Sequence, residues 1–271
     1  MTPSPRTYLF VPGDRPERFD KALASGADAV VLDLEDAVAP NDKPRARDAV
    51  AQRLQAATAD EHARFVVRIN DESSAEFDAD MAMLAACNTA LVMLPKAERA
   101  ATVARVRAAC PGIAVLALIE TARGVLNAEA LAEAEGVQRL VFGTIDFALD
   151  LGLSGDPLGF DFAASRLALA SRAAGLAAPV AGVTPDIGDP APLLADLQRA
   201  RAHGYTAKLC IHPKQVALIH TALQPTAAEL DWAQRVLAAA QGAAGAVQVD
   251  GRMVDKPVLQ RAQTLLQRAA R

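Results

Sequence analysis

Residues 114–146 read AVLALIETARGVLNAEALAEAEGVQRLVFGTID, and this stretch decides the fold. An apolar run from Ala114 to Ile119 stops at the carboxylate of Glu120, a helical segment follows, and a second apolar run leads to Asp146. Buried parallel strands read as such apolar runs, and the site residues of parallel α/β folds lie at the carboxyl ends of the strands. The stretch therefore predicts two strands that each deliver one acid at or just past the strand end.

The pairing of Glu120 with Asp146 indicates a metal site. Proteins hold Mg²⁺ through one or two carboxylates, while waters and substrate oxygens complete the octahedron. Taken singly, Glu120 could cap a helix and Asp146 could be a solvated loop acid. Two acids brought to the same end of a sheet favour a hard divalent cation over these alternatives.

The alternation of strand and helix continues through the chain. Eight apolar runs, each followed by a helical pattern, begin at about Thr7, Ala29, Arg64, Ala90, Ala114, Leu140, Pro179 and Ala207. This number and order favour an α/β fold of the (β/α)₈ TIM-barrel type over an open doubly wound sheet. We expect a catalytic barrel over residues 1–225 and a small C-terminal helical lid or appendage over residues 226–271.

Composition excludes several classes of function. The net charge of -4 gives no basic excess, which argues against nucleic acid as a principal partner. The three cysteines lack metal-binding spacing, which fits a reducing cytoplasm rather than a disulfide framework. The sequence shows neither a signal peptide nor a run approaching the ~20 apolar residues of a membrane span. We expect a soluble, cytoplasmic protein.

Further charged residues lie at the expected strand ends. Asp33, Glu35 and Asp36 follow the second strand, where they repel one another unless a cation, an arginine or water separates them. A solvated loop is the alternative for these acids. Arg68 lies inside an apolar run, and an unpaired buried arginine is costly. Its guanidinium must therefore meet a carboxylate, either of the protein or of a substrate.

Two other polar residues have a local structural explanation. Asp255 precedes Lys256 and Pro257, so it is a reasonable N-cap of a last helix. A lone histidine such as His212 is more often structural than functional. Neither residue would be assigned to a site from its local sequence alone.

Motifs over nearly the whole chain are recognisable together. They are Leu9–Gly13, Asp33–Val38, Val67–Asn70, Leu94–Lys96, Ile119–Gly124, Phe142–Asp146, Ile211–Gln215 and Gly251–Pro257. In this order they resemble the citrate lyase β-subunit-like family of malyl-CoA, citramalyl-CoA and citryl-CoA lyases, within the HpcH/HpaI aldolase superfamily. The resemblance implies a Mg²⁺-dependent TIM-barrel enzyme that cleaves or forms a C–C bond in a 3-hydroxyacyl-CoA thioester. The products of cleavage would be an acyl-CoA and a 2-oxo acid.

The resemblance also implies roles for individual residues. Glu120 and Asp146 would be the Mg²⁺ ligands, with Glu120 also in contact with substrate, and Arg68 would bind the oxo acid or its carboxylate during catalysis. Asp255 resembles the catalytic acid/base, which reaches the barrel mouth of a neighbouring subunit in a homotrimer. Glu35 and Asp36 would order the metal's waters and Arg68. The positions that resemble CoA contacts are Phe10, Arg15, Lys21, Ile211 and His212.

The substrate and the direction of the reaction stay open at this level. Many relatives carry an Asp-Gly pair after strand seven, where this chain has Gly182, Val183, Thr184 and Pro185. One alternative is a CoA-thioester hydrolase on the same scaffold. Another is a non-catalytic CoA-ester-binding protein or a subunit of a citrate lyase complex. The joint presence of Glu120, Asp146, Arg68 and Asp255 argues against a non-catalytic role.

Overall fold

The computed structural model of the 271-residue chain describes residues 4–241 and 247–269. The chain forms two compact units, Met1–Ile219 and His220–Arg271, and each is described by itself. The boundary between these two units falls within α11 (Pro213–Leu223). The division expected from the sequence, a catalytic barrel up to residue 225 and a lid or appendage after it, stays a prediction.

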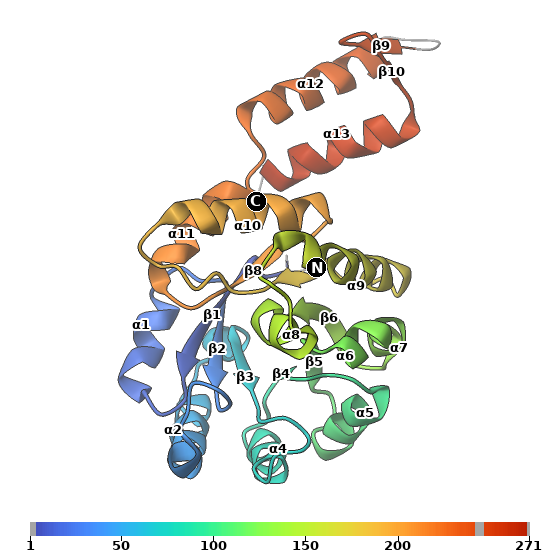
Figure 1. Ribbon diagram of the computed structural model, residues 1–271. Coiled ribbons are helices and arrows are strands. Elements are labelled where there is room, and N and C mark those ends of the chain that lie inside the picture. Colours follow the sequence, from blue (N-terminus) through green and yellow to red (C-terminus); the bar gives the residue numbers. More distant parts are fainter. Residues whose placement is uncertain (1–3, 242–246, 270–271) are drawn as a thin grey trace. The chain divides into compact units, whose positions relative to one another are not determined.

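The first unit is a closed barrel of eight parallel strands, as the alternation of apolar runs predicts (Figure 1). Each strand pairs with the next along the chain, and the last pairs with the first, so the sheet has no free edge. The strands are β1 (Thr7–Pro12), β2 (Ala29–Asp33), β3 (Phe65–Arg68), β4 (Leu91–Leu94), β5 (Ala114–Ile119), β6 (Val137–Phe142), β7 (Val180–Ala181) and β8 (Ala207–Cys210).

The barrel interior is filled by apolar side chains from all eight strands. These buried residues are Tyr8, Ala29, Val31, Val66, Met93, Leu116, Leu118, Val141, Val180, Ala207 and Leu209. Successive side chains of a strand point to opposite faces, so alternate residues fill the barrel while their neighbours pack under the helices. The interior is therefore a packed core, and functional groups are confined to the rims.

Helices surround the strands (Figure 1). In the first unit they are α1 (Phe19–Leu23), α2 (Lys43–Gln55), α3 (Ala59–His62), α4 (Phe77–Ala86), α5 (Ala100–Ala109), α6 (Ala122–Leu126), α7 (Ala128–Glu133), α8 (Thr144–Leu151), α9 (Asp161–Ala173), α10 (Pro190–Ala202) and the start of α11. Proline stands in the first turn of α2 and α10, where its missing N–H costs nothing. Between β1 and β2 the chain forms a 3-10 turn, Pro16–Arg18, followed by the short α1.

Strand β7 has only two residues, in the place where the sequence predicts a strand that begins at about Pro179. Proline cannot donate a ladder hydrogen bond. At the other end, the Gly182 carbonyl accepts a hydrogen bond from Lys208 Nζ at 2.6 Å. A Cβ at Gly182 would lie 2.7 Å from the Phe142 carbonyl oxygen, so only glycine allows this close approach of β6. Ladder pairing therefore ends after two residues.

The second unit contains α12 (Ala227–Gln241), β9 (Val247–Val249), β10 (Arg252–Val254) and α13 (Lys256–Ala269). Its core is formed by Ala233 and Val236 of α12 with Ala262 and Leu265 of α13. β9 and β10 pair as an antiparallel hairpin, and both residues of its turn, Asp250 and Gly251, have positive φ (52° and 73°). Asp-Gly suits such a turn because both residue types tolerate the left-handed region. In the described part of the chain, no helix is long and apolar enough to cross a membrane.

Candidate active site

Arg68 lies at the end of β3 and is surrounded by carboxylates. Its Nε and Nη2 atoms donate to the two oxygens of Asp33 at 2.7 and 2.6 Å, a bidentate pair. Its Nη1 atom lies 2.9 Å from Glu35 Oε2 and 3.2 Å from Asp36 Oδ2. The guanidinium also stacks over the Phe10 ring, 4.8 Å from the centroid. The prediction that Arg68 must meet a carboxylate is confirmed, and the partners are acids of the protein itself.

The charges of this cluster largely compensate one another. Burial alone would lower the pKa of Arg68, but Asp33, Glu35 and Asp36 raise it overall, so the arginine stays charged. Burial raises the pKa of Glu35 to about 7, although Arg68 opposes the shift. Lys96 Nζ lies 3.3 Å from Glu35 Oε1 and adds a second cation. Glu35 and Asp36 therefore both contact Arg68, while their predicted roles in ordering Arg68 and the metal's waters stay predictions.

Glu120 directly follows β5 and is buried, with 2% of its surface exposed. Its Oε1 atom accepts a hydrogen bond from the Lys96 backbone N–H at 2.7 Å. It does not cap a helix, because the N-cap of α6 is Thr121, whose side chain accepts from Gly124 N at 3.0 Å. Burial raises the pKa of Glu120 to about 8, and the negative charges of Glu35 and Asp146 contribute to the shift.

Asp146 lies in the first turn of α8 rather than in a loop, and it is half-buried. Helix α8 begins directly after β6 because Gly143 ends the strand and its carbonyl accepts the Phe147 N–H at 3.1 Å. The charge of Asp146 acts on the pKa of Glu120, so the two acids lie close enough to interact. The fold thus brings together the two carboxylates that the opening stretch predicts.

The donor set of this pair fits a magnesium ion. Carboxylate oxygens are the ligands that Mg²⁺ prefers, and two of them suffice when waters and substrate oxygens complete the shell. Within residues 4–241 and 247–269, no three His, Cys, Asp or Glu side chains converge as a metal cage. A site with few protein ligands suits Mg²⁺ better than Zn²⁺.

The positions that resemble CoA contacts follow two adjacent strands. Phe10 lies on β1, Arg15 and Lys21 come after it, and Ile211 and His212 directly follow β8, which pairs with β1. Arg15 is exposed and lies 3.9 Å from Asp14. The Ile211 N–H donates to Gln215 Oε1 at 2.9 Å, and His212 Nδ1 accepts from the Lys214 N–H at 3.2 Å. Phe10, Ile211 and His212 thus lie on or directly after neighbouring strands, whereas Lys21 lies on α1, and the role of these positions toward CoA stays a prediction.

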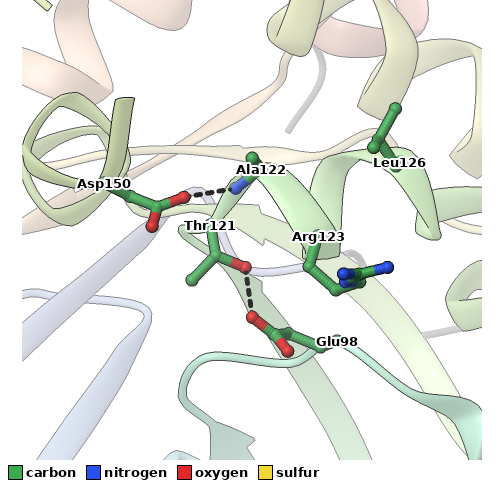
Figure 2. A pocket seen from close by; sticks show the side chains of 6 residues that line it. All are labelled: Glu98, Thr121, Ala122, Arg123, Leu126 and Asp150. Atoms are coloured by element: carbon green, nitrogen blue, oxygen red, sulfur yellow. Dashed lines mark hydrogen bonds between the residues drawn. The ribbon is translucent and has the colours of Figure 1, made fainter. Parts of the chain in front are cut away.

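A pocket of about 450 Å³ lies just beyond Glu120. Figure 2 shows the Thr121 hydroxyl donating to Glu98 Oε1 at 2.8 Å, and the Ala122 N–H donating to Asp150 Oδ2 at 2.7 Å. Its other lining residues are Arg123 and Leu126. None of the predicted site residues lines this pocket.

Asp255 precedes α13 in the second unit and is exposed. Its Oδ1 atom accepts the Val258 N–H at 3.0 Å, which confirms the expected helix cap. The other carboxylate oxygen is left for a proton, and the catalytic role of Asp255 stays a prediction.

Sequence reasoning gave no role to three residues of the site. Asp33 was seen only as part of an acid cluster, but β2 and β3 place it opposite Arg68 in the register. Strand register, which the sequence alone does not fix, was the missing signal. Lys43 Nζ binds the Glu35 carbonyl at 3.1 Å, and Lys96 contacts both Glu35 and Glu120. No pattern at Lys96 indicates those contacts.

Known proteins share this architecture. Residues 6–213 match the model of the HpcH/HpaI aldolase/citrate lyase family, and residues 175–271 match a family described as a C–C bond lyase of the TIM-barrel fold. A citrate lyase subunit beta-like protein of Mycobacterium tuberculosis is 41% identical over 269 residues, which cover 97% of this chain and 94% of the relative. A (3S)-malyl-CoA thioesterase of Cereibacter sphaeroides is 35% identical over 257 residues, 92% and 89% of the two chains.

A solved structure extends the similarity to three dimensions. CitE from Mycobacterium tuberculosis, in complex with magnesium, acetoacetate and coenzyme A, matches with a TM-score of 0.90 and 38% sequence identity. The match covers 100% of both chains.

Proposed function

Because this chain belongs to the HpcH/HpaI aldolase/citrate lyase family, we propose that it is a Mg²⁺-dependent carbon–carbon lyase of 3-hydroxyacyl-CoA thioesters. Malyl-CoA, citramalyl-CoA and citryl-CoA are the candidate substrates, each cleaved to an acyl-CoA and a 2-oxo acid. The observation that carries the proposal is the buried carboxylate of Glu120, held at a strand end and coupled electrostatically to Asp146. The magnesium and coenzyme A bound by the similar CitE structure support it.

In this proposal Glu120 and Asp146 hold the metal. When bound, Mg²⁺ would act as a Lewis acid that stabilises negative charge on the oxo-acid oxygen. Burial is the largest cause of the raised pKa of Glu120, the charges of Glu35 and Asp146 add to it, and a divalent cation beside the carboxylate would favour its ionised form. Glu35 and Asp36 border the same region and would order the waters of the ion.

Arg68 supplies a fixed positive charge beside the pair. Its bidentate contact with Asp33 and its contact with Glu35 hold the guanidinium in one orientation before substrate arrives. A charge that needs no reorganisation during the reaction is more effective than a mobile one. We therefore assign Arg68 to binding the carboxylate of the oxo acid and stabilising developing negative charge.

Asp255 is the proposed acid/base. In cleavage, the hydroxyl group of the substrate loses its proton to solvent and becomes the carbonyl of the oxo acid, the C–C bond electrons pass to the thioester fragment, and the Asp255 carboxylic acid gives a proton to the enolate carbon. In condensation, the carboxylate removes that proton from the acyl methyl group. The Val258 N–H holds one carboxylate oxygen and so orients the other. We further propose that Asp255 acts on the barrel of a neighbouring subunit in a homotrimer, which light scattering of the protein in solution would test.

A thioesterase is the second candidate, because relatives named (3S)-malyl-CoA thioesterase match most of this chain. On that alternative, water attacks the thioester carbonyl and the C–C bond survives. The CoA-contacting positions Phe10, Arg15, Lys21, Ile211 and His212 would serve either reaction.

Product identification separates the two reactions. The protein would be incubated with Mg²⁺ and each of malyl-, citramalyl- and citryl-CoA, and the products measured by mass spectrometry. We expect acetyl-CoA with glyoxylate, pyruvate or oxaloacetate, according to the substrate. Free CoA with intact hydroxy acid would select the thioesterase, and recovery of all three esters unchanged would contradict both reactions on this panel.

A further inference from the structure

Lys96 has an unusual backbone conformation. It follows β4 after one intervening residue, Pro95, and has a φ of 45°, in the left-handed region that L-residues rarely adopt. Among the described non-glycine residues, only Asn88, Lys96 and Asp250 have positive φ. Asparagine and aspartate are enriched in this region, whereas lysine is not. Such strain persists only where the surroundings impose it, and it gathers at functional sites.

The contacts of Lys96 show what this conformation provides. Its backbone N–H points at Glu120 Oε1, 2.7 Å away, and this hydrogen bond opposes the rise in the pKa of Glu120. Its side chain turns to other acids, with Nζ 3.3 Å from Glu35 Oε1 and 3.6 Å from Asp71 Oδ2. The peptide N–H of Lys96 therefore holds Glu120, while its ammonium lies nearest to Glu35 and Asp71 and acts on Glu120 only through longer-range electrostatics.

Gly143 confines the same carboxylate from another side. A Cβ at this position would lie 2.5 Å from Glu120 Oε2 and 2.6 Å from Glu120 Cβ, too close for any side chain. The Gly143 N–H donates to the Ile119 carbonyl at 2.9 Å, so ladder pairing fixes its backbone beside Glu120. Glu120 is thus held between a peptide N–H and a glycine that no larger residue can replace without displacement.

We propose that Lys96 is a positioning residue for Glu120 and acts through its left-handed peptide rather than through its ammonium. The peptide N–H takes Oε1 and sets the plane of the carboxylate, which leaves Oε2 for a cation. This inference rests on the proposed function only in assigning that cation as Mg²⁺. The contact itself can be measured without metal.

The first experiment titrates Mg²⁺ alone into each variant by calorimetry, at a pH above the pKa of Glu120. Lys96→Gly removes the ammonium but adopts the left-handed conformation freely, and Lys96→Asn tolerates it. Lys96→Val disfavours it because valine is β-branched. We expect affinity close to wild type for the Gly and Asn variants. The Val variant should bind about 10- to 100-fold more weakly, as is typical when the partner of a metal ligand is lost.

Gly143→Ala is an independent test, because the added methyl group would displace Glu120 Oε2 while Lys96 itself is unchanged. We expect weaker Mg²⁺ binding there too, with circular dichroism confirming that each variant is folded. If Lys96→Gly weakens binding as much as Lys96→Val, the ammonium is responsible and the inference is wrong. Wild-type affinity in a folded Val variant would also overturn it.

The second experiment uses metal-free protein. Amide hydrogen exchange should show the Lys96 N–H protected in the wild type and faster to exchange in Glu120→Ala, which removes the acceptor. Unchanged protection in Glu120→Ala would overturn the contact. If wild-type protein shows this protection but binds no Mg²⁺, the proposed metal function fails while the positioning of Glu120 stands.

Discussion

Two parts of the barrel rim carry acids in different electrostatic states. At the ends of β2 and β3, Asp33, Glu35 and Asp36 all contact Arg68. Near the ends of β5 and β6, Glu120 and Asp146 lie together, and no Lys, Arg or His side chain of the described residues forms an ion pair with either. We call the first part the compensated cluster because its acids are ion-paired with Arg68, and the second the uncompensated pair because neither acid has an ion pair among the described residues.

This difference predicts how substitutions in each part affect stability. A compensated cluster stabilises the native state only as a whole, because removing its one arginine leaves buried acids unpaired. An uncompensated pair costs stability and persists where it serves another purpose, such as binding a cation. Substituting Arg68 should therefore lower the free energy of unfolding, whereas neutralising Glu120 should leave it unchanged or raise it.

The largest expected effect is on turnover. Glu120→Gln or Asp146→Asn removes ligand charge from a site with few protein ligands, and we expect either change to abolish activity. Steady-state assays with the CoA esters would measure it. Full activity in either variant, or in wild type with excess chelator, would contradict the metal assignment.

In contrast to its activity, the free energy of unfolding of the metal-free Glu120→Gln protein should not fall. A folded-state pKa of about 8, above the usual value of 4.5, means that the unfolded chain releases the Glu120 proton at lower pH than the fold does, so the fold loses stability as pH rises from about 4.5 to 8. Glutamine removes that cost while keeping the shape. Urea unfolding at neutral pH should show equal or greater stability, and a large loss would mean that Glu120 is structurally essential.

The opposite behaviour is expected at the compensated cluster. Arg68→Met leaves Asp33 buried without its cation and Glu35 with Lys96 alone, which should cost about 3–5 kcal/mol of unfolding free energy. Arg68→Lys should lose less, because one charge remains, but an ammonium cannot reproduce the planar fork toward Asp33. Urea unfolding of metal-free proteins measures both. A Met variant as stable as wild type would show that these acids are effectively solvated.

Asp255 lies outside both clusters. Its substitution by asparagine can distinguish a helix-capping role from a catalytic role. Asparagine caps helices about as well as aspartate, so Asp255→Asn should leave the melting temperature nearly unchanged. As an acid/base it could not exchange the proton, and turnover should fall by roughly 10²-fold or more. Wild-type turnover in Asp255→Asn would mean that Asp255 serves only as the N-cap of α13.

Subunit exchange tests whether the site is shared. Mixing inactive Asp255→Asn with inactive Glu120→Gln protein would regenerate some sites with both native residues if Asp255 acts across a subunit boundary. We expect partial recovery of activity. No recovery, with exchange confirmed independently, would mean that Asp255 does not act on a neighbouring barrel.

The smallest expected effect is on pH dependence. Binding of Mg²⁺ must displace the proton of Glu120, whose pKa burial raises to about 8. Below that pH, affinity should rise by about tenfold per pH unit and then level off above it. Calorimetry across this range measures the slope. A flat profile between neutral pH and the pKa would show that Glu120 carries no proton when the metal binds.

The sequence was sufficient to predict the barrel because this fold depends on a simple alternation of apolar strands and helices. Apolar runs such as Ala114–Ile119 are buried on both faces in the closed sheet, and each one places a polar residue such as Glu120 at the same rim. Local capping was also readable, since Asp255 caps α13 as its position before Lys256 indicates.

Contacts that depend on register and backbone conformation were not readable. The bidentate pairing of Arg68 with Asp33 depends on which residues of β2 and β3 face each other. The hold on Glu120 depends on the positive φ of Lys96, and no propensity predicts a left-handed lysine. The placement of Asp146 on a helix required Gly143 to end β6 where it does.

The central claim is that Glu120 and Asp146 hold a divalent cation. Mn²⁺ can report on it directly, because electron paramagnetic resonance measures the free ion during a titration. A matched control is Glu98→Gln, which removes a nearby acid that bonds to Thr121 and belongs to neither cluster. We predict one Mn²⁺ site in wild type and Glu98→Gln, displaced by Mg²⁺, and loss of that site in Glu120→Gln and Asp146→Asn. Equal Mn²⁺ binding in all four proteins would contradict the claim.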